Sequence, residues 1–249
     1  MSNFFVLFKK EFKGQLKTYR FLIVVALFFV FGLGTPLLLK YLHVLIPAQD
    51  SVIGIPEFTA ADAVQSFISS LGQLGLVAAV LVAMGSVAGE RESGTAAMTL
   101  SKPVGSGSFI LAKLAALSAT FGAAIIVGAA GCYLYTVVLF GNPGGFKFLA
   151  ACLLGALYLL FCLAVTVMYS AFVRSSIAAG GLSFVTLVAI AGTAGLPGIK
   201  YYSPGALVSW AEDIAMSGGP NSWWVLAVSI ALIILVIVTG WRVFKAKEL

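Results

Sequence analysis

The stretch AVQSFISSLGQLGLVAAVLVAMGSVAGERESGT, residues 63–95, decides the fold class. It carries no charged side chain over residues 63–89, and it then ends in the acid–base–acid cluster ERE at 90–92. A membrane-spanning helix needs about 20 consecutive apolar residues. The stretch is therefore long enough for one span that ends at a charged surface.

The rest of the chain has the same composition. Of its 249 residues, 61% are hydrophobic and 10% are charged, whereas a soluble domain has about 45–50% apolar and about 25% charged residues. Six uncharged runs reach or approach the length of a span: 21–39, 63–89, 114–146, 148–173, 175–199 and 214–241. The short alternating strands of a membrane barrel are not seen. We therefore predict an all-α membrane protein with six transmembrane helices.

The basic residues predict the orientation of these spans. Cytoplasmic loops carry an excess of lysine and arginine, and a cytoplasmic N-terminus with six spans places 12 of the 15 basic residues inside. We therefore expect a multi-pass protein of the cell (cytoplasmic or inner) membrane with both termini in the cytoplasm. The net charge of +6 reflects this topology, and no nucleic-acid partner is expected.

We expect a single transmembrane domain over residues 1–249, with spans at about 21–42, 60–89, 109–139, 148–172, 177–195 and 223–242. Thr59 and Asp62 have the spacing of a capping box at the start of the second span. A short helix is expected over residues 206–216, and the sequence leaves open whether it re-enters the bilayer.

An amphipathic helix is predicted before the first span, over residues 4–20. Its apolar face recurs at steps of three and four residues and consists of Phe5, Phe8, Phe12, Leu16 and Tyr19. A basic helix of this kind lies in the headgroup layer. It is either a simple anchor or an elbow helix that also borders a cytoplasmic partner.

The chemistry of an enzyme is missing from the sequence. Acids, bases and histidines inside a membrane are costly and usually functional, and the six runs contain none. No G-x-x-x-x-G-K-[ST] loop for nucleotide phosphates can be drawn, and the three cysteines fit no metal motif. We predict no catalytic residue, no metal site and no cofactor in this chain.

The cytoplasmic connector, residues 90–108, is the most informative segment. A short helix over 96–101 is expected, capped at its start and ended by Pro103. The run "GERESGT…LSKPV…F…KL" resembles the connector after the second span in permease subunits of the type-two ABC transporter family, in the small six-span branch of the nitrous-oxide-reductase maturation and gliding-machinery permeases. The matching positions are Glu90, Arg91, Glu92, Gly94, Thr95, Ser101, Pro103 and Val104, with Lys113 on the downstream basic position. The family's basic stretch after Pro-Val is replaced here by Gly105-Ser-Gly-Ser108.

The resemblance implies a permease subunit of an ATP-driven transporter, of the exporter type. It implies two copies of a separate ABC ATPase subunit, which bind ATP and magnesium, and a second permease copy in a homodimer or heterodimer. It also implies docking on the ATPase through the connector, residues 90–103, with the residues Glu90, Arg91, Glu92, Gly94, Thr95 and Pro103. We expect the charged cluster to lie outside the apolar bundle, where it is alternatively only a solvated helix end.

Polar residues in the second and fifth spans mark a possible translocation path: Gln65, Ser66, Ser69, Gln73, Thr186 and Thr193. Alternatively they are ordinary polar groups of helix packing. Because the expected path has few charges, an apolar or amphipathic cargo is favoured over a small ion. The alternative function is a stand-alone membrane scaffold or a secondary transporter without an ATPase partner.

Overall fold

A computed structural model describes residues 2–45, 58–92, 94, 106–195, 202–216 and 223–246. These residues form helices and contain no strand. The helices are α1 Ser2–Lys17, α2 Arg20–Leu45, α3 Ala60–Ala83, α4 Ala88–Glu92, α6 Ser106–Phe140, α7 Gly145–Phe172, α8 Ser176–Thr193, α9 Ala206–Met216 and α10 Trp223–Ala246. Within the described part, 6 segments are long and apolar enough to cross a membrane. The predicted all-α fold with six spans and an N-terminal helix is confirmed.

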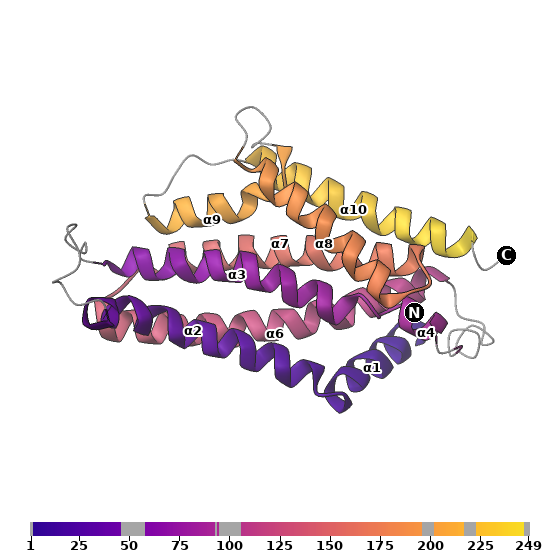
Figure 1. Cartoon of the computed structure of the whole chain (residues 1–249), viewed down its shortest axis with the longest axis horizontal. Helices are drawn as coiled ribbons and strands as arrows, with labels where there is room; N and C mark the ends of the chain where they lie inside the picture. The colour runs from indigo at the N-terminus through magenta and orange to yellow at the C-terminus, as the bar shows by residue number, and fades with distance from the viewer. Residues whose placement is uncertain are drawn as a thin grey trace.

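The spans run side by side along the long axis of the molecule (Figure 1). Both chain ends, α1 and α4 lie at one end of this bundle, which we call the termini end. The short helix α9 lies at the opposite end, which we call the distal end, where it packs against α3 and α7. The two ends of the bundle therefore carry different structures.

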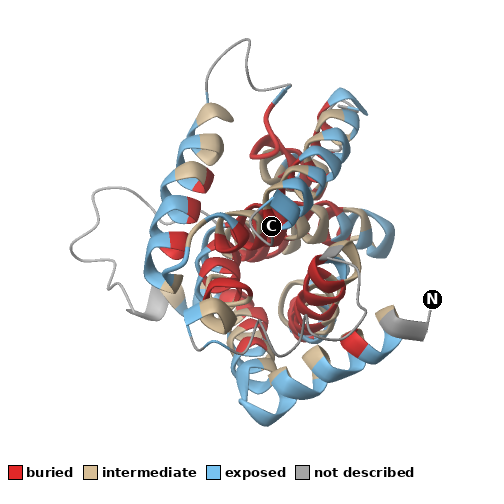
Figure 2. Cartoon of the chain, turned by 90° about the vertical axis from the view of Figure 1, so that its right-hand side faces the viewer, coloured by how far each residue is buried: buried red, intermediate tan, exposed pale blue. Residues whose placement is uncertain are grey.

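Helix α7 is the central span. It packs against α3, α8, α9 and α10, and 67% of its most apolar segment is buried, compared with 22% of that of α8. Figure 2, which looks onto the termini end, shows the buried residues gathered in the middle of the bundle. Large parts of the outer helices are exposed and apolar, which fits contact with lipid or with another membrane chain.

The helices α2 and α6 approach each other at two glycines. A Cβ atom placed on Gly32 would come within 3.0 Å of the backbone of Gly128, and one placed on Gly128 would lie 2.7 Å from the carbonyl oxygen of Phe28. A missing Cβ lets membrane helices come this close. This pair therefore fixes the first span against α6.

The second predicted span is broken, whereas we expected one continuous helix to about Gly89. Helix α3 ends at Ala83, and α4 begins at Ala88 after a turn. The buried hydroxyl of Ser170 on α7 donates to the carbonyl oxygen of Met84 at 2.7 Å, and it accepts from the amides of Val87 at 3.0 Å and Ala88 at 2.9 Å. Backbone groups freed inside a membrane protein need such partners. The side chain of Ser170 thus stabilises the break.

The first helix, α1, crosses the termini end of the bundle rather than running along it (Figure 2). Its contact with the bundle does not use the predicted apolar face as a whole. Leu7 is buried and Glu11 and Gln15 are half-buried, whereas Phe5 is 71% exposed. The helix is therefore held to α6 in part by polar side chains, and its exposed aromatic residues are left for the membrane.

The predicted start of the second span has the expected geometry. The carboxylate of Asp62 accepts from the amide of Thr59 at 2.7 Å, and the hydroxyl of Thr59 accepts from the amide of Asp62. This reciprocal pair is a capping box. The short helix expected at residues 206–216 is also present, as α9.

Candidate functional site

Two regions of the structure contain predicted functional residues together with charged or polar partners. The first is a charged junction at the termini end, formed by Glu11, Glu90, Arg91, Glu92 and Lys113. The second is a cavity between α3, α7, α8 and α9. The junction contains the charged cluster.

The junction has a buried ion-pair network at its centre. The ammonium group of Lys113 on α6 lies 2.6 Å from a carboxylate oxygen of Glu90 on α4 and 3.1 Å from one of Glu11 on α1. The side chain of Lys113 is only 3% exposed. Removing one member of a buried ion pair costs about 3–5 kcal/mol, because the other charge is left without compensation. The network therefore ties α1, α4 and α6 together.

Arg91 connects α4 to two further helices. Its guanidinium donates to the carbonyl oxygen of Ala171 at the end of α7, at 2.9 Å, and lies 4.9 Å from the ring centroid of Phe244 on α10. The ring of Phe244 stacks on Phe109 of α6, and the ammonium of Lys113 lies over Phe109. Both cations are thus placed over the faces of one aromatic pair, an arrangement that attracts cations to the rings.

Glu92 is the exposed member of the cluster. One of its carboxylate oxygens accepts a hydrogen bond of 2.8 Å from the hydroxyl of Ser176, the first residue of α8. Ser176 in turn packs near Gly85 and Gly89, where an added Cβ would lie 3.6 and 3.5 Å from its hydroxyl. The small residues of the second span therefore let α8 come close to α4.

Gly94 ends the charged segment for a backbone reason. Its φ is +69°, in the left-handed region, and its amide donates to the carbonyl oxygen of Arg91 at 3.2 Å. A glycine in this conformation commonly follows the last turn of a helix. Thr95, Pro103 and the predicted short helix at 96–101 lie outside the described residues.

The structure thus differs from the expectation that the whole cluster lies outside the bundle. Glu90 and Arg91 are half-buried and contact α6, α7 and α10, and Glu92 alone is exposed. The sequence reasoning also missed Glu11. It is the only acid among the basic residues of 1–20, and that exception could have indicated a specific partner.

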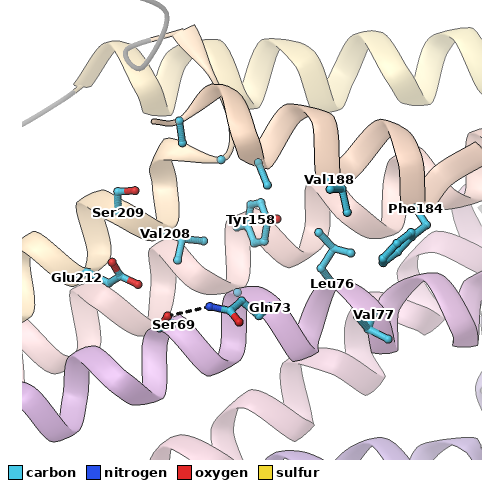
Figure 3. A pocket seen from close by; sticks show the side chains of 14 residues that line it. Ser69, Gln73, Leu76, Val77, Tyr158, Phe184, Val188, Val208, Ser209 and Glu212 are labelled. Atoms are coloured by element: carbon cyan, nitrogen blue, oxygen red, sulfur yellow. Dashed lines mark hydrogen bonds between the residues drawn. The ribbon is translucent and has the colours of Figure 1, made fainter. Parts of the chain in front are cut away.

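The second region is a cavity of about 370 Å³. Figure 3 shows its lining side chains, which come from α3, α7, α8 and α9. The apolar part of the lining includes Leu76, Val77, Phe184, Val188 and Val208. Pockets for small organic molecules have volumes of about 300–1,000 Å³ and a mostly apolar lining with a few polar groups. The cavity meets both conditions.

Two of the predicted path residues, Ser69 and Gln73, line this cavity. The amide nitrogen of Gln73 donates to the hydroxyl oxygen of Ser69 at 3.3 Å. Glu212 on α9 also lines the cavity, and Figure 3 shows its carboxylate on the side of Ser69. The two helices therefore present a small polar group to an otherwise apolar space.

The other four path residues do not line the cavity. Gln65 and Ser66 are half-buried on α3. The hydroxyl groups of Thr186 and Tyr169 are 3.0 Å apart, and Thr193 donates to the carbonyl oxygen of Ile190. Thr193 also donates to the hydroxyl of Ser203 at 2.8 Å, so both threonines have partners within the protein, as in ordinary packing.

Sequence reasoning missed Glu212. Burial raises the pKa of its carboxyl group, a hydrogen bond with Ser69 lowers it, and the nearby charge of Asp213 raises it, with burial the largest effect. The adjacent acids Glu212 and Asp213 in a largely apolar short helix were the available signal. No group of three or more potential metal ligands occurs among the described residues.

A family model described as "ABC-2 family transporter protein" matches residues 5–249. The uncharacterized transmembrane protein YxlG of Bacillus subtilis (strain 168) is 26% identical over 258 residues, which cover 100% of this chain and 99% of that protein. The family match agrees with the resemblance noted in the connector.

Proposed function

Because the chain belongs to the ABC-2 family of transporter proteins, we propose that it is the permease subunit of an ATP-driven exporter. A separate ABC ATPase subunit, present in two copies, would dock at the termini end and bind ATP and magnesium. One observation carries this proposal. The charged junction links the segment that leaves the second span to α1, α6, α7, α8 and α10 at a single end of the bundle.

The junction suits the transmission of a movement from outside the membrane. A partner that displaces α4 would act on α1 and α6 through Lys113, on α7 and α10 through Arg91, and on α8 through Glu92. The break between α3 and α4 interrupts the second span, so α4 is not a rigid continuation of α3. Helices α3 and α8 also line the cavity, so a force at the termini end can change the cavity.

The distribution of basic residues supports the orientation in this proposal. With the termini end in the cytoplasm, 12 of the 15 lysines and arginines lie on the cytoplasmic side, as the positive-inside rule requires. The docking surface would then face the compartment that holds ATP. The protein would lie in the cytoplasmic (inner) membrane.

A second permease copy would complete the translocation path. Val77 of α3 and Phe184 and Val188 of α8 line the cavity and are exposed in the single chain. Exposed apolar patches of this kind mark contact with lipid or with another protein. We propose that the second copy, identical or homologous, covers this face and that the path runs between the two.

Co-purification tests the proposed function. The tagged chain is purified in mild detergent from membranes of the organism that encodes it, and associated proteins are identified by mass spectrometry. We expect an ATPase with a G-x-x-x-x-G-K-[ST] loop, and ATP hydrolysis by the complex but not by the chain alone. Ion-driven transport by the chain without an ATPase would instead establish the secondary transporter, and neither activity nor ATPase would indicate the scaffold.

A further inference from the structure

We propose that the cavity between α3, α7, α8 and α9 binds an organic cation with an apolar body, and that the carboxylate of Glu212 pairs with its charge. This proposal deepens the proposed function by naming the cargo class, and the status of the cation as cargo rests on that function. The binding itself does not, because it uses only groups of this chain.

The charges of the lining determine the sign of the ligand. Glu212 is the single charged residue that lines the cavity, and no lysine, arginine or histidine does so in the described part of the chain. Burial of an unpaired charge is costly, so a partly buried carboxylate gains from a ligand of opposite sign. A cationic group seated beside α9 would supply that partner.

The carboxylate of Glu212 lies on the side of the polar pair Ser69 and Gln73 of α3 (Figure 3). Gln73 donates to the hydroxyl oxygen of Ser69 at 3.3 Å, and the nearby hydroxyl of Ser69 lowers the pKa of Glu212. This arrangement leaves the hydroxyl hydrogen of Ser69 for the carboxylate, which favours the ionised form. The two α3 side chains therefore give the acid a polar neighbour without neutralising it.

The remaining lining suits an apolar and aromatic body. Tyr158 of α7 and Phe184 of α8 bring two rings to the cavity, and Leu76 and Val188 lie between them and around them (Figure 3). Aromatic faces attract organic cations as well as apolar groups. The cavity therefore matches both the positive charge and the apolar body of a lipophilic cation, whereas it matches only the apolar body of an anion of the same shape.

A matched pair of probes tests this inference. Binding of tetraphenylphosphonium and of tetraphenylborate, which share a shape and differ in charge, is measured by equilibrium dialysis with the full chain in an uncharged maltoside detergent. We expect saturable binding of the cation and weaker binding of the anion. Glu212→Gln, which keeps the size of the side chain, should weaken cation binding by about tenfold or more, where tenfold corresponds to about 1.4 kcal/mol.

Asp213→Asn is the control, because Asp213 is exposed on the same helix and does not line the cavity. It removes the same charge from α9 and, at a pH high enough for Glu212 to be ionised in both proteins, should leave binding close to that of the wild type. Equal binding of both probes, or equal cation binding by wild type and Glu212→Gln, would show an apolar cavity without charge recognition and would overturn the inference.

The pH profile gives a second measurement that does not depend on a variant. Burial and the nearby Asp213 raise the pKa of Glu212, and cation binding needs the ionised form. Affinity should therefore be full at high pH and fall as pH decreases through this raised pKa. Among the lining residues, α3 and α8 contribute no titratable side chain and α7 contributes Tyr158. A profile that is flat, or the same in Glu212→Gln, would contradict the proposal.

A choline headgroup carries the same charge, so lipid is a second source of the cation. Dialysis is therefore repeated with phosphatidylcholine added to the micelles. Displacement of tetraphenylphosphonium would assign the carboxylate site to a lipid headgroup, and its retention would assign the site to a free cation. Selective binding of the cation by a chain that co-purifies with no ATPase would support this inference and refute the proposed function. An ATPase complex that does not discriminate the probes would support the proposed function and refute this inference.

Discussion

Glu92 differs from the two residues before it because its side chain is exposed and has a single described partner, the hydroxyl of Ser176. Glu90 and Arg91 contact other helices of the chain, so their substitution would disturb the bundle as well as any docking. Substitution of Lys113 would destabilise the bundle further, because it leaves the carboxylates of Glu11 and Glu90 without their cation. At the scale of residues, Glu92 is therefore the position that separates docking from folding.

We predict that Glu92→Ala folds normally but loses ATPase association or coupled turnover. Loss of one member of a desolvated interface pair costs about 2–5 kcal/mol, or roughly 30-fold or more in affinity. Ser176→Ala is the matched control, because it removes the hydrogen bond within the chain and keeps the charge. Pull-down of the ATPase by each variant provides the measurement. Equal losses in both variants would mean that Glu92 only holds α8 in place.

At the scale of elements, the break between α3 and α4 depends on a side chain from another helix. The hydroxyl of Ser170 satisfies three backbone groups of the turn. The turn also contains Gly85 and Ser86, which are poor helix formers. Local propensity thus permits the break, and α7 determines its position.

We predict that Ser170→Ala destabilises the protein by about 1–3 kcal/mol, because it leaves buried backbone groups of the turn unsatisfied. Ser183→Ala is a suitable control. Ser183 is equally buried, but its hydroxyl donates to the carbonyl oxygen of Ala179 within its own helix, which already has the helical amide as a partner. Urea unfolding and hydrogen exchange of the amides of Val87 and Ala88 would measure the effect. Similar losses in both variants would exclude a special role for Ser170.

At the scale of the whole molecule, the bundle has two unlike ends. The termini end carries the charged junction and the helix that crosses the bundle, and the distal end carries α9 (Figure 1). Two helices that line the cavity, α7 and α8, also contact the junction. This separation of charge and cavity suits a protein that receives a force at one end and handles a ligand nearer the other.

We predict that a reporter active only in the cytoplasm works when fused after Leu249 or inserted within 105–108. It should be silent within residues 141–145, at the opposite end of the third span. The distribution of basic residues predicts this orientation. Activity of the reporter in the 141–145 insertion would contradict both the topology and the proposed placement of the ATPase.

The number of spans, the capping box of Thr59 and Asp62 and the short helix at 206–216 could be predicted from the sequence. Hydropathy and capping depend on neighbours within one helix, so the local pattern contains the necessary information. The same holds for the charged cluster, which was found as an exception to its surroundings. Its flanking pattern also indicated the family.

Only the tertiary structure determined what these residues contact. Some residues that are far apart in the chain lie close together in the structure, and nothing in a local pattern pairs them. These pairs are Glu11 with Lys113, Ser170 with Met84, and Ser69 with Glu212. Hydrogen bonds and ion pairs act over a few ångströms, so a partner is set by which helices pack together. The sequence thus determined that the chain is a six-span membrane protein with a charged connector, whereas packing determined that two of the three charges are internal and that an acid lines the cavity.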